Sequence, residues 1–436
     1  MRTKAALLFL FVWFWCCLGF PKASPRLSLH LSPIIQVIFP NGLRLLVVKR
    51  NHTHNVAVTL MIGAGQITEG ENDTGITNFM QHYLLDIPVD HYHDAASAVE
   101  EKGGLAGSET GPDNSSINIL ISPKVFPFAV RVLSSLVQPQ KIYPNRFKRI
   151  RKEMLLDIKS SRDNAFQALY GIFLRQFYAF HPYREPISGT SVAVKDITPQ
   201  KLEKYFNSYY VPNNMVIAVV GNVSADRVIH DVSQGFSDLK SKPLPSQNIY
   251  YQPVLSYGKQ INLNAPGNIA WLFAGFSAPR LSSADYASMQ VINAVLGASI
   301  GSRLWNAIRE KRGLAYELSS HYSAREGPSH FIAYVITRPT ELNKSRFHFL
   351  RQISLMHQKT LTEERLSEAK REVIGHFILK LEANSAQAKY LAWSDLMGKG
   401  IDFYKKYISA IREVTPAMVQ KTARKYLQNY ILISVQ

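Results

Sequence analysis

The residues best placed for chemistry lie in TGITNFMQHYLLDI, residues 74–87, where Asn78, Gln81 and His82 share one side of a predicted helix. Asn78 and His82 are four positions apart, so they lie one turn apart on the same helix face. In the zinc motif H-x-x-E-H these positions carry two histidine ligands and a glutamate general base. An amide is a poor zinc ligand, and Gln81 cannot accept a proton from bound water. The stretch therefore predicts a degenerate zinc motif in which His82 is the remaining histidine, with no metal bound by this chain.

Two other features could suggest chemistry or binding. His91 and His93 in DHYHD are two residues apart, but no further ligand follows within reach, so we expect a solvated loop. The formal net charge is +18, and the densest basic cluster is RFKRIRKE at residues 146–153. No stacking-aromatic module or nucleic-acid motif accompanies this cluster. We therefore expect a solvated helix face or a docking patch for an acidic partner, and no nucleic-acid partner.

The elements around these residues are repeated along the chain. DITPQKLEKYFNSYYVPNNMVIAVVG and EVTPAMVQKTARKYLQNYILISV each predict a helix that begins after Thr-Pro and is followed by an apolar strand. Their threonines, Thr198 and Thr415, are 217 residues apart. RIRKEMLLDI and SEAKREVIGHF, around Glu153 and Glu372, match at an offset of 219. Two matches at nearly the same offset predict an internal duplication.

Within each repeat, strands come first and a run of helices follows. We therefore predict the α+β class with two homologous halves, each a mixed or antiparallel β-sheet backed by helices. In the first half, VIFPNGLRLLVVKR predicts a hairpin with Asn41-Gly42 at its turn. The predicted domains are residues 33–236 and 254–436, joined by a proline-containing linker at 237–253.

Residues 1–23 have the composition of a secretory signal peptide, in which a basic start precedes an uncharged apolar run from Ala5 to Phe20. That run is short for a bilayer span, so we expect membrane attachment only through an uncleaved leader. Both cysteines, Cys16 and Cys17, lie inside the leader, so the mature chain would have no thiol for disulfides or metal ligation. These features predict an exported protein of a bacterial periplasm.

The stretches AGQITEGENDTGITNFMQH, HPYREPISGT and YYVPNNMVIAVVGNV resemble first-half signatures of the insulinase/pitrilysin zinc metallopeptidase family. In that family a glutamate on a later helix is the third zinc ligand. The matching residue here is Asp157, a shorter carboxylate, and the acidic residue usual one helical repeat earlier is Ile150. The resemblance therefore implies that Asn78, Gln81, His82 and Asp157 are degenerate zinc-site positions, with no catalytic residue in the first half.

The resemblance continues in the second half, where GSRLWNAIREKRGLAYELSS matches a family signature. Arg309 and Tyr316 match the Arg/Tyr pair with which members bind substrate. A guanidinium can hold a peptide carbonyl or carboxylate, and a phenol can donate to a developing oxyanion. In the first half the glycines Gly103-Gly104 are kept, but the asparagine typical beyond them is Gly107, which weakens the expectation that substrate pairs with that edge strand.

Some members of this family work as heterodimers, in which one subunit carries the zinc motif and the other supplies the Arg/Tyr pair. Two such subunits close like a clamshell. The resemblance implies that this chain is one half of a clamshell and the substrate-binding subunit of an exported zinc metalloendopeptidase acting on peptides or unfolded proteins. The zinc would belong to a homologous partner subunit, and this chain alone would hydrolyse little or nothing.

Three alternatives remain open at this point. The chain could be a non-proteolytic scaffold, like the core subunits of respiratory complexes, although Arg309, Tyr316 and the leader argue against this. It could be the inactive half of a mitochondrial presequence peptidase, but that subunit has a long glycine-rich loop where this chain has the short LGASIGSRL. It could also be a residual catalyst that uses His82 and Asp157.

Overall fold

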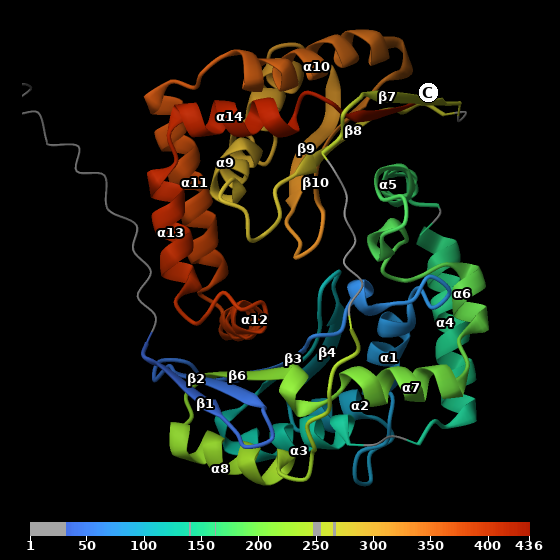
Figure 1. The fold of residues 1–436 in the computed structure, drawn as a ribbon, viewed down its shortest axis with the longest axis vertical. Helices are drawn as coiled ribbons and strands as arrows, with labels where there is room; N and C mark the ends of the chain where they lie inside the picture. The colour runs from blue at the N-terminus through green and yellow to red at the C-terminus, as the bar shows by residue number, and fades with distance from the viewer. Residues whose placement is uncertain (1–31, 139–140, 162, 247–253, 265–266) are drawn as a thin grey trace, which may run out of the picture.

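The computed structural model describes residues 32–138, 141–161, 163–246, 254–264 and 267–436. The predicted leader, residues 1–23, and residues 247–253 of the predicted linker lie outside these described residues. The structure contains two β-sheets, one from each half. They lie in the upper and lower parts of Figure 1, and helices flank each of them. Among the described residues, no helix has both the length and the apolar character needed to cross a membrane.

The first half contains the elements up to α8. Its strands are β1 (Ile34–Ile38), β2 (Arg44–Lys49), β3 (Val56–Ile62), β4 (Leu105–Thr110), β5 (Ser115–Ile121) and β6 (Met215–Gly221). Its α-helices are α1 (Ile76–Leu85), α2 (Ala95–Glu101), α3 (Phe126–Val137), α4 (Pro144–Ser161), α5 (Ala165–Phe177), α6 (Ser191–Asp196), α7 (Pro199–Tyr209) and α8 (Ala225–Phe236). Single turns complete it: η1 (Gln66–Thr68), η2 (Pro123–Val125), η3 (Pro182–Arg184) and η4 (Pro212–Asn214).

The second half contains the remaining elements. Its strands are β7 (Lys259–Leu263), β8 (Ala270–Ala278), β9 (Ala315–Ser323), β10 (Ser329–Thr337) and β11 (Ile431–Val435). Its α-helices are α9 (Tyr286–Leu296), α10 (Leu342–Gln358), α11 (Glu363–Lys380), α12 (Asn384–Leu396), α13 (Phe403–Glu413) and α14 (Pro416–Tyr426). The π-helix η5 (Trp305–Glu310) follows α9, and the turn η6 (Pro339–Glu341) precedes α10.

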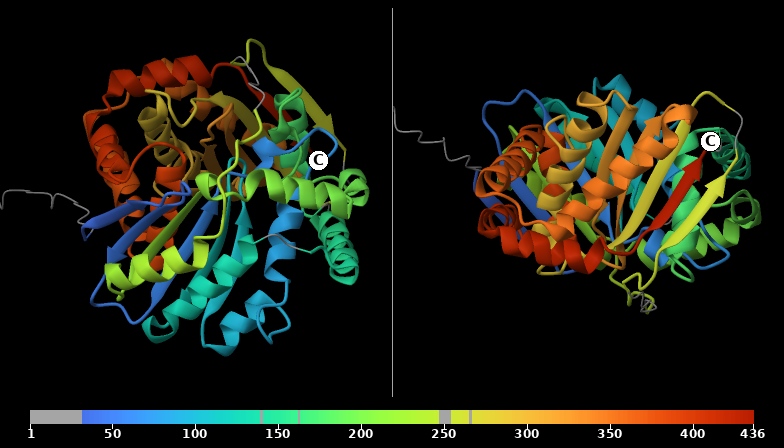
Figure 2. Two further views of the ribbon diagram at one scale, coloured as in Figure 1. Left: turned by 60° about the horizontal axis from the view of Figure 1, so that its bottom comes forward. Right: turned by 90° about the horizontal axis from the view of Figure 1, so that it is seen from above.

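The predicted duplication is visible in the order of the strands. In the described chain the first sheet has the order β1-β2-β6-β3-β5-β4, and the second has the order β7-β11-β8-β10-β9. Without the additional β1, the two orders are the same when strands are counted along each half. The parallel pairs correspond as well, since β2 is parallel to β6 and β11 is parallel to β7. Figure 2 shows the red β11 beside the yellow β7 from above. The predicted α+β class with two homologous halves is confirmed.

Local sequence signals set the repeated elements. Thr198 and Thr415 are N-cap residues, and their side chains accept hydrogen bonds from the backbone N–H groups of Lys201 and Met418. A threonine at this position, followed by proline at the first helical position, satisfies helix-terminal groups and fixes where the helix begins. The predicted first hairpin is also present, and Gly42 in its turn has a φ of 84°.

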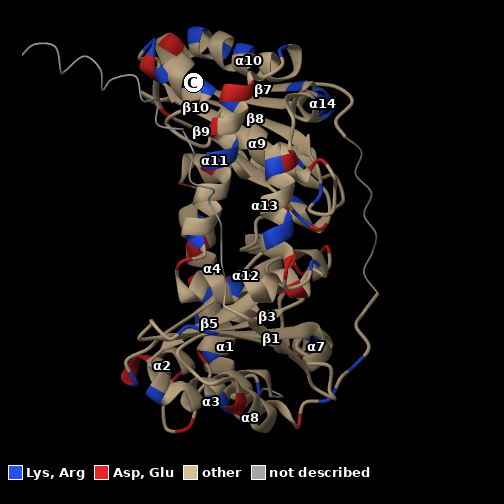
Figure 3. Ribbon diagram, turned by 90° about the vertical axis from the view of Figure 1, so that its left-hand side faces the viewer, with Lys and Arg blue, Asp and Glu red and all other residues tan. Residues whose placement is uncertain are grey.

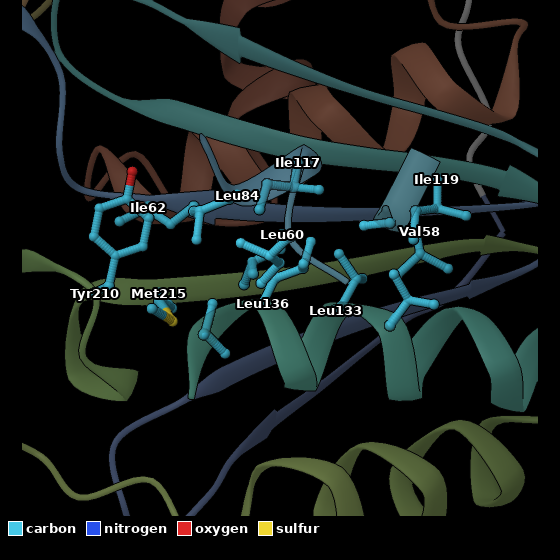
Figure 4. Packing of buried hydrophobic residues seen from close by; sticks show 14 of the residues in the cluster. Val58, Leu60, Ile62, Leu84, Ile117, Ile119, Leu133, Leu136, Tyr210 and Met215 are labelled. Atoms are coloured by element: carbon cyan, nitrogen blue, oxygen red, sulfur yellow. The ribbon is translucent and has the colours of Figure 1, made fainter. Parts of the chain in front are cut away.

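The main core of the first half lies between its sheet and its own helices. Val58, Leu60 and Ile62 of β3 point to the same side and pack against Leu133 and Leu136 of α3 (Figure 4). Alternate residues of a strand point to opposite faces, and Ala57 and Met61 of β3 are buried as well. Both faces of this sheet are therefore covered.

The second face of each sheet is covered by a helix from the other half. Helix α12 of the second half packs Leu391 and Ala392 against the first sheet. Helix α5 of the first half packs Phe173 and Phe177 against the second sheet. This exchange of helices buries apolar surface from both halves and fixes their relative position.

A buried polar network also joins the halves. The Tyr178 hydroxyl donates to the carbonyl of Pro328 at 2.8 Å and lies 2.8 Å from Nδ1 of His330. The guanidinium of Arg325 lies over the ring of Tyr183, 4.4 Å from its centroid. The Tyr183 hydroxyl in turn donates to Asp113. A buried charge needs such partners, because water is no longer available to solvate it.

Candidate functional site

Helix α1 carries the three polar residues of the degenerate zinc motif. Its predicted apolar stripe is confirmed, with Phe79 and Tyr83 fully buried. The three polar side chains differ in exposure: His82 is exposed, Asn78 is half-buried and Gln81 is buried. The structure therefore places His82 toward solvent and Gln81 inside the protein.

Gln81 connects α1 to two distant segments. Its Nε2 donates to Oγ of Ser115 at 3.0 Å and to the hydroxyl of Tyr210 at 2.7 Å. Its Oε1 is buried and has no hydrogen-bond partner within the described residues. The amide thus acts as a donor that joins α1, the start of β5 and the end of α7, and it has no basic oxygen that could take a proton from water.

A carboxyl group that sequence reasoning missed lies at the beginning of α1. Glu69 is buried, and its two oxygens accept hydrogen bonds from the backbone N–H groups of Gly75 at 2.9 Å and Thr77 at 3.1 Å. These N–H groups belong to the first turn, where an acceptor is needed. Burial raises the pKa of Glu69 from 4.5 to about 7, although both hydrogen bonds act in the opposite direction. The sequence signal that could have found Glu69 is a carboxylate shortly before the glycine at which α1 begins, because the first N–H groups of a helix need an acceptor.

Gly75 allows α1 to start where it does. Its φ is 90°, in the left-handed region. A Cβ atom on Gly75 would lie 2.7 Å from the carbonyl oxygen of Ser188 and 2.8 Å from Cα of Gly189. The loop before α1 and the loop before α6 therefore approach each other closely through two glycines.

Asp157, the expected position of the third zinc ligand, lies on α4. Its side chain is exposed and makes no hydrogen bond or ion pair with any described residue. Ile150, on the same helix, is buried in the core. Helix α4 packs on α1 through Phe147 and Phe79, whose ring centroids are 4.8 Å apart. In the core, the contact between these two helices is therefore apolar.

The residues present do not fit a zinc ion. Asn78 and Gln81 offer amides, and the Nε2 of Gln81 is engaged with Tyr210 and Ser115. Across the described ranges, no group of three or more His, Cys, Asp or Glu side chains is arranged to hold a metal ion. We therefore derive no metal-dependent step from this chain's own residues.

The other histidine pair and the basic cluster are on the surface. His91 and His93 are exposed, and Nδ1 of His93 contacts Oδ2 of Asp94 at 3.0 Å. In the basic cluster, Arg146 and Arg149 both pair with Asp86. The cluster is therefore partly neutralised by the protein itself.

Arg309 and Tyr316 come together at one edge of the second sheet. Arg309 lies in η5, and its guanidinium sits 4.5 Å from the centroid of the Trp305 ring. Its Nη1 donates to the backbone carbonyl of Tyr316. The Tyr316 side chain is 54% exposed, and its hydroxyl has no hydrogen-bond partner among the described residues. The two side chains therefore present a cation and a phenol to solvent.

The strands at these edges are open on one side. In the described chain, β9 pairs only with β10, and β4 pairs only with β5. Nothing lies within 4 Å of a Cβ atom placed on Gly107, so the face of β4 is open at this position. An edge strand with free backbone groups can accept an extended peptide as an additional strand.

Comparisons with known proteins agree with this architecture. A family model described as "Insulinase (Peptidase family M16)" matches residues 44–191, and one described as "Peptidase M16 inactive domain" matches residues 196–373. An uncharacterized zinc protease of Bacillus subtilis is 22% identical over 394 residues, which cover 90% of this chain and 95% of the relative. An uncharacterized zinc protease of Rickettsia felis is 24% identical over 370 residues, covering 84% and 87% of the two chains.

Solved structures show the same fold. A protease from Helicobacter pylori matches with a TM-score of 0.86 and 19% identity, over 93% of this chain and 100% of that chain. A peptidase M16 inactive domain from Pseudomonas fluorescens matches with a TM-score of 0.84 and 19% identity, over 92% and 98% of the two chains. The two family models match in succession along most of the sequence: the chain belongs to the insulinase (M16) peptidase family, and its second half matches the model described as the inactive domain of that family.

Proposed function

We propose that this chain is the zinc-free, substrate-binding subunit of a heterodimeric zinc metalloendopeptidase that acts on peptides or unfolded proteins. A homologous subunit with an intact zinc motif would supply the metal. The apolar leader supports export, and we place the pair in a bacterial periplasm. The observation that carries this proposal is the contrast between α1, which has lost its ligands and base, and the exposed Arg309 and Tyr316.

The proposed role of Arg309 and Tyr316 is to hold substrate against the partner's site. The Arg309 guanidinium is restrained by the Trp305 ring and by the Tyr316 carbonyl, so little conformational freedom would be lost on binding. Its remaining N–H groups can donate to a peptide carbonyl or carboxylate. The free Tyr316 hydroxyl can donate to an oxygen that becomes negative in the transition state.

A scaffold subunit without a role in peptide binding is the competing function. Such a subunit would need neither an exposed guanidinium nor an exposed phenol at a sheet edge. The exposure of Tyr316, at 54%, next to the exposed Arg309 supports a binding role because both groups are accessible to a peptide at the same sheet edge. The two functions differ in what they predict for peptide binding by the isolated chain.

Fluorescence anisotropy with a labelled unfolded peptide tests this difference. The purified chain should bind the peptide without cleaving it, and Arg309→Ala should weaken binding about tenfold, as expected for the loss of a charge-assisted hydrogen bond. Lys406→Ala removes the same charge from an exposed position on α13 and should leave binding unchanged. Cleavage by the isolated chain that a chelator abolishes would contradict the proposal, and so would equal binding by both variants.

A further inference from the structure

A pocket of about 400 Å³ lies beside η5. It is formed by residues from η5 and the loops around it, from α10 and from the beginning of α11. Its charged lining consists of Arg303, Lys311, Arg312, His348, Arg351 and Arg365. Blue segments mark the basic residues along α10 in Figure 3. The size is typical of a pocket for a small molecule.

The positive charge of this pocket is largely uncompensated. Arg365 pairs with Glu368 at 3.0 Å. For the other cations, the described residues offer no ion pair: Arg303, Lys311, Arg312 and Arg351 have no carboxylate within 4.0 Å. Like charges held together raise the free energy of the folded protein unless an anion joins them.

Two internal contacts hold part of the lining in place. Nη1 of Arg312 donates to the carbonyl of Ala307 at 2.7 Å, and Nη2 of Arg365 donates to the carbonyl of Gly301 at 2.9 Å. The cations also lower the pKa values of two lining residues. Burial and the nearby Arg365 lower the pKa of Arg303, and burial, Arg312 and Arg351 lower the pKa of His348. These residues therefore lie close enough to influence one another's charge.

We propose that this pocket is a binding site for a compact soluble anion that carries two or more phosphoryl groups. Arg303, Arg351 and Arg365 line the pocket from three different segments of the chain. A tetrahedral phosphoryl group presents oxygens in several directions and can accept from all three, whereas a planar carboxylate presents only one edge. Arginine is suited to such contacts because its N–H groups form a rigid fork.

The site is distinct from the peptide-binding residues but adjoins them. Lys311 and Arg312 directly follow η5, which carries Arg309. The bond from Arg312 to Ala307 returns to the same π-helix. The anion would therefore bind on one side of η5 while the Arg309 side chain remains exposed.

Isothermal titration of the full chain with inorganic pyrophosphate tests the proposal, with ionic strength held constant by sodium chloride. We expect saturable binding with one site per chain. Arg351→Ser should weaken it about tenfold, because one charge-assisted contact is lost. Arg351 is exposed and makes no ion pair with the described residues, so this change should leave the fold intact.

Two controls distinguish a specific anion-binding site from nonspecific attraction of anions to a basic protein. Lys406→Ser removes the same charge from α13, outside the pocket, and should leave the affinity unchanged. Citrate should bind at least tenfold more weakly than pyrophosphate, since its groups are planar. The proposal of an anion site would be overturned if pyrophosphate showed no saturable binding. It would also be overturned if Lys406→Ser weakened the affinity for pyrophosphate as much as Arg351→Ser. Equal affinity for citrate would overturn its assignment to phosphoryl groups.

Discussion

Replacing Glu69 with glutamine should remove a pH dependence of stability that this buried carboxyl group imposes on the first half. Burial raises its pKa from 4.5 to about 7 in the folded chain. The folded state therefore keeps a proton that the unfolded state has released. The stabilising contribution is fully present below pH 4.5 and is lost as the pH rises through about 7.

The size of this effect follows from the two pKa values. One pKa unit corresponds to about 1.4 kcal/mol, so the difference between 4.5 and about 7 corresponds to roughly 3 kcal/mol. Glu69 is 4% exposed, so solvent screening reduces this figure little. Glutamine resembles the protonated carboxyl group, since it offers one acceptor oxygen and carries no charge at any pH.

Urea denaturation followed by far-UV circular dichroism between about pH 5 and about pH 8 measures the difference in unfolding free energy between Glu69→Gln and the wild type. The unfolding free energy of Glu69→Gln, relative to that of the wild type, should increase by about 2 to 3 kcal/mol as the pH rises through this range. Glu101→Gln changes an exposed carboxylate on α2, and its difference in unfolding free energy from the wild type should not change with pH. A Glu69→Gln difference that does not change with pH would refute the reasoning.

Three further predictions concern the fold and the metal. Arg325→Met should lower the unfolding free energy by about 2 kcal/mol, measured by urea denaturation, because it removes a buried guanidinium that lies over the rings of Tyr178 and Tyr183. Gly75→Ala should cost about 2 kcal/mol or more, measured in the same way, whereas Gly107→Ala should change stability by less than about 0.5 kcal/mol because its surroundings are open. The purified chain should contain no stoichiometric zinc by elemental analysis, and a chelator should leave its melting temperature unchanged; a chelator-induced drop would reveal a metal that stabilises the fold.

Local patterns predicted much of the fold. The apolar spacing of Phe79 and Tyr83 identified α1, and the Thr-Pro signals at Thr198 and Thr415 identified the starts of α7 and α14. These features depend on neighbouring residues, which the sequence displays directly. Two such signals at a nearly constant spacing also identified the duplication.

The exchange of helices between the halves could not be predicted in the same way. Helices α5 and α12 each have an apolar face, but the spacing of apolar residues does not say which sheet that face will cover. The choice depends on how the two halves are packed together. It is a property of the tertiary structure.

The candidate site was predicted in part. The residue types at Asn78 and Gln81 indicated the loss of ligands and base, but the partners of Gln81 come from segments far along the chain. Tyr210 is one of these, and no local pattern links it to Gln81. Similarly, the sequence placed Arg309 near Tyr316, while the contact of the guanidinium with the Tyr316 carbonyl required the turn from η5 into β9.

The most direct test of the central claim is peptide hydrolysis by the chain reconstituted with a homologous subunit that carries an intact zinc motif. The account predicts chelator-sensitive cleavage by the pair, and a fall in kcat/KM of about 10- to 100-fold when this chain carries Arg309→Ala. Lys406→Ala should leave kcat/KM unchanged. If the pair that carries Arg309→Ala cleaves peptide as fast as the pair with the unaltered chain, this chain does not bind substrate through Arg309.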